Sequence, residues 1–155
     1  MKIDSGQLIK NILTYLDLAR EEAKHHNPNA TSIYLEDIKS VAYMISRPDL
    51  AFLADYIIKT IDDLNYLEIL GKFRKSEEYR RTLEKTEFDD EEFKEFLTAL
   101  ITPPPEEFLA FIDSLVQSLD AMEKFIEKDE GFGEVIASLI DLMKVADRLK
   151  RLYGG

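Results

Sequence analysis

Apolar side chains recur at steps of three and four residues along most of this 155-residue chain, and no long stretch alternates apolar with polar residues. Three- and four-residue spacing gathers side chains on one face of an α-helix, whereas a half-buried strand needs alternation. The first such stripe consists of Leu8, Ile9, Ile12, Leu13, Leu16, Ala19 and Ala23. This periodicity predicts an all-α fold.

Helix start and stop signals divide the first half of the chain. We predict helices over residues 5–26, from residue 31 to the Arg47-Pro48 pair, and from Pro48, as first helical residue, to about residue 61. Thr31 or Ser32 is the expected N-cap of the second helix. The chain from Thr60 to Leu64 fits either a break or a continuous helix into residues 64–85.

The second half carries three more start signals. Asp89 and Glu92 form a capping box, flanked by Phe88 and Phe93 as a hydrophobic staple, and the helix it starts must stop before residues 103–105, which are all proline. A sixth helix begins at residue 105, and its apolar stripe is wide enough to face two neighbours. A last helix follows the glycines at 131 and 133 and ends near residue 153, and its apolar stripe consists of Val135, Ile136, Leu139, Ile140, Leu142, Met143, Ala146, Leu149 and Leu152.

Together these segments predict one compact, bundle-like domain over residues 1–155, built of six to seven helices, with Gly154 and Gly155 as a tail. The chain has no cysteine, which excludes disulfides, thiolate metal sites and a cysteine nucleophile. No signal segment or membrane span is visible, so we expect a soluble, cytoplasmic protein. Abundant Glu and Lys with only two Gln is typical of thermophiles.

Candidate chemical sites are sparse. Glu22 and His25 have the spacing of a half-site in a di-iron bundle, but no second pair completes it, so we predict a solvated helix end and no metal. The acidic clusters Asp62-Asp63 and Asp89 to Glu92 could serve as acid/base carboxylates or cation ligands, but we expect them at helix starts, where the helix dipole and capping already favour acids. No phosphate loop or nucleophile motif occurs. We therefore expect no enzyme activity and no cofactor.

Charge is unevenly distributed. The net charge of the chain is −11, which opposes nucleic-acid binding at long range. Residues 72–85 reverse this sign, with six cations against three acids and two interleaved aromatic rings. The candidate nucleic-acid-binding residues are these six cations: Lys72, Arg74, Lys75, Arg80, Arg81 and Lys85.

A solvated helical face explains the same cations, since Arg74 with Glu78 and Glu77 with Arg81 form ordinary ion pairs four residues apart, and we prefer this interpretation. Residues 87–95 carry a net charge of −5 beside this basic segment. Such a dipolar surface suits the docking of copies head to tail. A second basic stripe, Lys144, Arg148 and Arg151, is expected at the C-terminal end of the last helix.

The segment of residues 41–57 places Ala42, Tyr43, Arg47, Leu53 and Ala54 in a helix–turn–helix pattern. It resembles the corresponding segment in the small subunit of archaeal type I-A CRISPR surveillance complexes (Cascade). The resemblance implies a helical, non-enzymatic subunit of a ribonucleoprotein used in antiviral defense, present in several copies along a guide-RNA filament and helping to hold target or displaced DNA. The alternative is an acidic helical adaptor that contacts only protein.

Overall fold

The computed structural model describes residues 4–64 and 106–153, and within them it contains five α-helices and no strand. They are α1 (Ser5–Lys24), α2 (Pro28–Met44), α3 (Pro48–Asp62), α6 (Glu106–Lys128) and α7 (Phe132–Tyr153). The predicted all-α class is confirmed for this part of the chain. The helices predicted over residues 64–85 and from residue 89 lie outside the described residues, so a count of six to seven is not supported.

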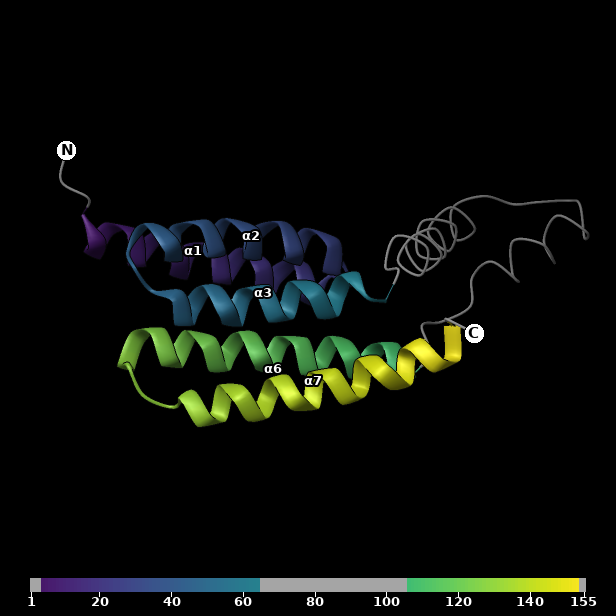
Figure 1. Ribbon diagram of the computed structural model, residues 1–155. Helices are drawn as coiled ribbons and strands as arrows, with labels where there is room; N and C mark the ends of the chain where they lie inside the picture. The colour runs from purple at the N-terminus through teal and green to yellow at the C-terminus, as the bar shows by residue number, and fades with distance from the viewer. Residues whose placement is uncertain (1–3, 65–105, 154–155) are drawn as a thin grey trace, which may run out of the picture.

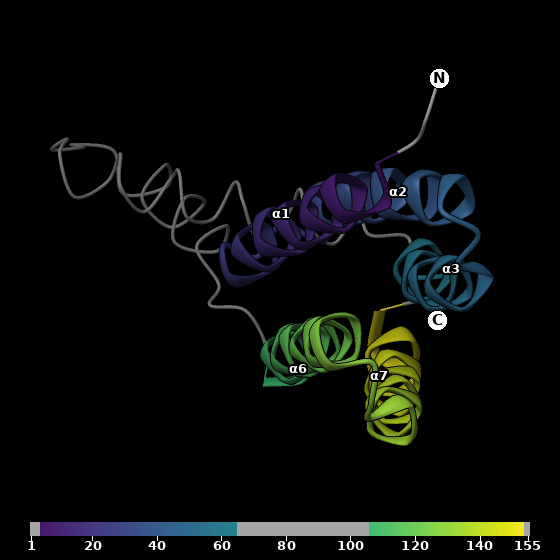
Figure 2. The same cartoon turned by 90° about the vertical axis from the view of Figure 1, so that its left-hand side faces the viewer.

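The five helices lie side by side with their axes roughly aligned (Figure 1). Successive contacts run from α2 to α1, from α1 to α6, from α6 to α7, from α7 to α3 and from α3 back to α2. This order forms a closed ring, visible when the bundle is viewed from its end (Figure 2). Buried side chains from all five helices fill the interior as one cluster. No helix within the described ranges is both long and apolar enough to cross a membrane.

The apolar stripe predicted for the first helix faces this interior. Ile12, Leu16, Ala19 and Ala23 are fully buried, and Ile9 and Leu13 pack against the same cluster. Asp4 caps the helix by accepting a hydrogen bond of 3.1 Å from the backbone N–H of Gln7. The helix ends at Lys24, two residues before the predicted end.

The second helix begins earlier than predicted. Pro28 is its first residue, because proline has no N–H and its fixed φ suits the first turn. The prediction that Thr31 or Ser32 caps this helix is therefore wrong. Thr31 instead lies buried inside the first turn and donates its hydroxyl hydrogen to the carbonyl oxygen of Ala19 at 3.0 Å. This bond ties the start of α2 to α1.

The third helix begins at Pro48 as predicted and ends at Asp62. Thr60 lies inside it, with its hydroxyl donating to the Tyr56 carbonyl at 2.8 Å, so Thr60 does not restart a helix. Asp62 and Asp63 lie at the C-terminal end of α3, not at a helix start as predicted. A helix C-terminus carries partial negative charge, so these two acids do not gain from the dipole of α3.

The last two helices form an antiparallel pair. Phe108, Phe111, Leu115 and Leu119 of α6 are fully buried, and α6 contacts both α7 and α1, which confirms the two-sided stripe predicted for it. Gly131 precedes α7 with a φ of +88°, a conformation that side chains other than glycine rarely adopt. The predicted break between the two helices is thus confirmed at Gly131, but the prediction that the last helix begins after Gly133 is wrong, because α7 begins at Phe132 and Gly133 lies in its first turn.

Candidate docking surface

The structure describes only part of the predicted site. Lys72, Arg74, Lys75, Arg80, Arg81 and Lys85 lie outside the described residues, as does the acidic stretch 87–95. The second basic stripe is described: Lys144, Arg148 and Arg151 are exposed near the end of α7. Arg151 also forms an ion pair of 3.0 Å with Asp147, four residues earlier. Of these three cations only Arg151 lies in the last turn of α7, where a cation faces the negative end of the helix.

The two histidines lie where α1 ends. His25 is exposed, and its Nδ1 is 2.7 Å from the carbonyl oxygen of Glu21. Glu22 accepts a hydrogen bond from the Asn27 side chain at 2.7 Å. His26 packs edge-on against the ring of Phe108, with centroids 5.8 Å apart. Among the described residues, no group of three or more His, Asp or Glu is placed to hold a metal ion.

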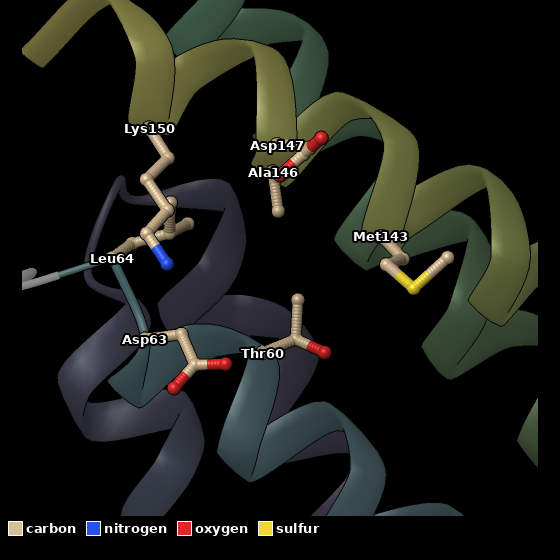
Figure 3. A pocket seen from close by; sticks show the side chains of 7 residues that line it. All are labelled: Thr60, Asp63, Leu64, Met143, Ala146, Asp147 and Lys150. Carbon is tan, nitrogen blue, oxygen red and sulfur yellow. The ribbon is translucent and has the colours of Figure 1, made fainter. Parts of the chain in front are cut away.

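Two shallow pockets are lined by described residues. One of about 80 Å³ opens between the C-terminal part of α3 and α7, and Figure 3 shows its lining: Thr60, Asp63, Leu64, Met143, Ala146, Asp147 and Lys150. The other, about 190 Å³, lies between α6 and α7 beside Arg148 and Glu107. Both are smaller than the roughly 300–1,000 Å³ typical of small-molecule sites.

On the side of the first pocket toward the N-terminal ends of α3 and α7, both helices expose apolar side chains along the boundary where they pack together. The Tyr56 hydroxyl donates to the Met143 sulfur at 3.2 Å, which fixes the register of the two helices. They run in the same direction (Figure 1), so one turn back from this contact Phe52 on α3 lies level with the turn of α7 that carries Ile140. Phe52, Ile140 and Met143 are 57, 43 and 47% exposed.

Arg47 lies at the N-terminal end of the boundary between α3 and α7, in the turn between α2 and α3. Its guanidinium forms two hydrogen bonds with the Asp49 carboxylate, at 3.1 and 3.0 Å, and lies 5.9 Å from the ring centroid of Phe125 on α6. The hydrogen bonds from Arg47 lower the pKa of Asp49, although burial opposes the shift. Arg47 therefore joins the α2–α3 turn to the α6–α7 hairpin.

The segment that carries the family resemblance occupies this corner. Its pattern residues Ala42, Leu53 and Ala54 are buried in the core. Leu50 and Ile57 are buried as well, whereas the pattern residue Tyr43 and two further large apolar side chains of the segment are exposed: Tyr43 is 62%, Met44 54% and Phe52 57% exposed. We call Tyr43, Met44 and Phe52 the corner surface. Aromatic residues, Met and Arg are the types enriched where proteins contact one another.

Two charged clusters join pairs of helices in the bundle, and neither includes a residue of the corner surface. Lys39 of α2 donates to Asp55 of α3 at 2.8 Å, and Lys59 also pairs with Asp55 at 3.0 Å, so the pKa of Asp55 is lowered and that of Lys39 raised. Arg20 of α1 pairs with Asp120 and Glu123 of α6. Both clusters fix helix positions, so the exposed side chains are held on rigid elements.

Sequence reasoning missed the outward-facing apolar residues. Ile140 and Met143 belong to the stripe predicted for the last helix, and periodicity gave no sign that they face solvent while Val135, Leu139 and Leu142 are buried. The available signal was that the apolar stripe of the last helix is wider than packing against one neighbouring helix requires.

Comparison of the chain with protein-family models, with curated proteins and with solved structures finds no match.

Proposed function

We propose that this protein is a non-enzymatic subunit that acts by docking within a larger assembly. The observation that carries the proposal is the corner surface: three large apolar side chains, each more than half exposed, on rigid helices beside a fixed arginine. Exposed aromatic and methionine side chains cost hydration free energy in an isolated chain, and contact with a partner recovers it.

The specific form of this proposal is the small subunit of a CRISPR RNA-guided complex of the type I-A Cascade kind. It rests on the resemblance over residues 41–57, whose outward residues are those of the corner surface. In such a complex the guide RNA reads sequence, and the small subunit packs along the backbone filament and helps hold target or displaced DNA. Contact with protein suits a chain with a net charge of −11, because a field of that sign repels nucleic acid at long range.

The test is capture of the assembly with a tagged chain in its native cells. Wild-type protein is compared with the Tyr43→Lys/Phe52→Lys variant, which places two charges on the corner surface. We expect the variant to lose at least about 90% of the captured partner subunits, since an unpaired charge in an interface costs several kcal/mol. Leu109→Lys on α6, where the side chain is 39% exposed, is the matched control and retains them.

Two outcomes separate the forms of the proposal. Ribonuclease-sensitive capture of guide RNA together with filament subunits supports the CRISPR form. Capture of protein partners without RNA supports the alternative, an acidic helical adaptor of an unrelated assembly, which the net charge of −11 favours. Equal capture by the wild type and the corner variant contradicts docking through this surface in either form.

A separate variant tests strand contact. If residues 72–85 follow a phosphate backbone, Arg74→Glu, Arg81→Glu and Lys85→Glu together lower the affinity of the assembly for single-stranded DNA and reduce the slope of its dependence on salt. Binding titrations at several salt concentrations measure both. Unchanged affinity and slope would assign these cations to a solvated face.

A further inference from the structure

A second apolar stripe runs along the outside of α7, apart from the stripe that faces the core. Phe132, Ile136, Ile140 and Met143 follow one another at steps of four, four and three residues. Phe132 is 45% exposed, and Ile136 is partly buried. Steps of four and three place side chains on one helical face and are the spacing of a coiled-coil seam. We call these four residues the α7 stripe, and it has the form of a helix-pairing surface.

Charge along α7 changes sign at the middle of the helix. Residues 128–141 hold four acids and one lysine, a net charge of −3, and residues 142–151 hold four cations and one acid, a net charge of +3. The acids nearest the start, Asp129 and Glu130, are exposed, and Asp129 is 83% exposed although it lies 3.7 Å from Arg47. Lys150 and Arg151 are exposed at the other end.

These two features together are self-complementary. A two-fold axis perpendicular to a helix brings the same patch of both copies together with the two helices antiparallel. The centre of the α7 stripe, between Ile136 and Met143, is about eleven residues, or about 16 Å of helix, from Lys150-Arg151, and about ten residues along the chain from Asp129-Glu130 in the turn before α7. An antiparallel pair centred there sets the acidic end of each copy against the basic end of the other.

We propose that two copies of this chain pair through α7, antiparallel, about a two-fold axis at the centre of the α7 stripe. This pairing goes beyond the capture of other subunits proposed above and does not rest on it. A parallel pair sets acid against acid and cation against cation, so the charge pattern selects the antiparallel direction. Phe52, on the neighbouring turn of α3, widens the apolar contact.

The available area sets the strength of the pair. The exposed parts of Phe52, Phe132, Ile140 and Met143 amount to on the order of 400 Å² per copy, at roughly 200 Å² for a large side chain. Stable interfaces bury about 800 Å² per partner. The charged ends must therefore supply about half of the contact, so the pair is reversible and weakens as salt screens it.

Sedimentation velocity of the purified full chain tests this. At low salt we expect a monomer–dimer equilibrium in the micromolar range, shifted at least about tenfold toward monomer in 1 M salt. The Ile140→Lys/Met143→Lys variant is expected to stay monomeric. Leu18→Lys, on α1 and 41% exposed in the wild type, is the matched control and keeps the wild-type equilibrium. Circular dichroism checks that each variant is folded.

A charge exchange tests the direction of pairing. Lys150→Glu/Arg151→Gln changes the charge of this pair from +2 to −1, and Asp129→Asn/Glu130→Lys changes the charge of that pair from −2 to +1. Each variant alone is expected to pair at least about tenfold more weakly than the wild type, and an equimolar mixture is expected to recover pairing as a heterodimer.

Three results would overturn the proposal: a single-copy mass at every concentration at low salt, a dimer that persists in Ile140→Lys/Met143→Lys, or no recovery in the mixture. Because these measurements use the isolated chain, their failure leaves capture of other subunits through the corner surface standing. Conversely, a result that contradicts docking of other subunits through the corner surface does not contradict the α7 pair.

Discussion

Arg20 is the residue whose charge joins α1 to α6. Its side chain is 17% exposed, its Nε lies 2.8 Å from Oδ1 of Asp120 without hydrogen-bond alignment, and its other nitrogens pair with Asp17 and Glu123. Removing it leaves three carboxylates facing one another across the two helices. We expect Arg20→Met to lower the free energy of unfolding by about 1–3 kcal/mol.

Urea unfolding measures this loss as a lower midpoint at an unchanged slope. Lys59→Met is the matched control, because Lys59 is 74% exposed and also pairs with a carboxylate, and a surface pair contributes less than about 1 kcal/mol. A change for Arg20→Met no larger than for Lys59→Met would show that the Arg20 cluster adds nothing to the α1–α6 contact.

Asp49 and Asp55 make stability depend on pH in the acid range. Their pKa values in the folded protein are lowered, by hydrogen bonds from Arg47 and from Lys39 and Lys59 respectively. The unfolded chain therefore binds protons first as pH falls. This contribution to stability is complete above the unfolded-state pKa of about 4 and is lost as pH falls through the lower folded-state values.

The Asp49→Asn variant separates the contribution of one carboxylate. We expect it to be less stable than wild type at pH 7 and to lose less stability between pH 5 and pH 3, because its side chain binds no proton. Urea midpoints at pH 7, 5 and 3 measure the difference between the two proteins. An identical acid loss in both would show that Asp49 is not held by Arg47 in solution.

At the scale of helices, two nearby glycines are expected to respond in opposite directions to alanine. Gly131 has a φ of +88° between α6 and α7, so Gly131→Ala strains the turn and lowers stability by about 1 kcal/mol. Gly133 lies in the first turn of α7 with open space around it, so Gly133→Ala raises stability by up to about 1 kcal/mol. Thermal unfolding of both variants measures the signs, and a shared sign would contradict this description of the turn.

The segments that form helices, and the faces that they bury, could be predicted from the sequence because three- and four-residue spacing is a local property. Buried Ile12 and Leu16 on α1, and Phe111 and Leu115 on α6, lie on the faces that the pattern indicated. Helix ends were harder, because proline both stops a helix and starts one. Pro28 starts α2 where the pattern placed a break.

For the whole molecule, the exposed surface could not be predicted from the sequence. Whether Met143 faces the core or solvent depends on how closely α3 packs against α7, and the chain separates these helices by more than 65 residues. Phe52 differs, because its spacing does not match the buried stripe of α3 and already favours the exposed position that it occupies. The charge change along α7, by contrast, was visible in part as the stripe Lys144, Arg148 and Arg151.

The central claim is that this chain works as a docking subunit of a larger assembly. The most direct test is the native mass of the tagged protein isolated from its own cells, measured before and after ribonuclease treatment. The account predicts a particle well above the 17.9 kDa of one chain, containing other protein subunits, with loss of mass after ribonuclease in the CRISPR form. Isolation of the chain with only its own mass, alone or paired, would contradict it.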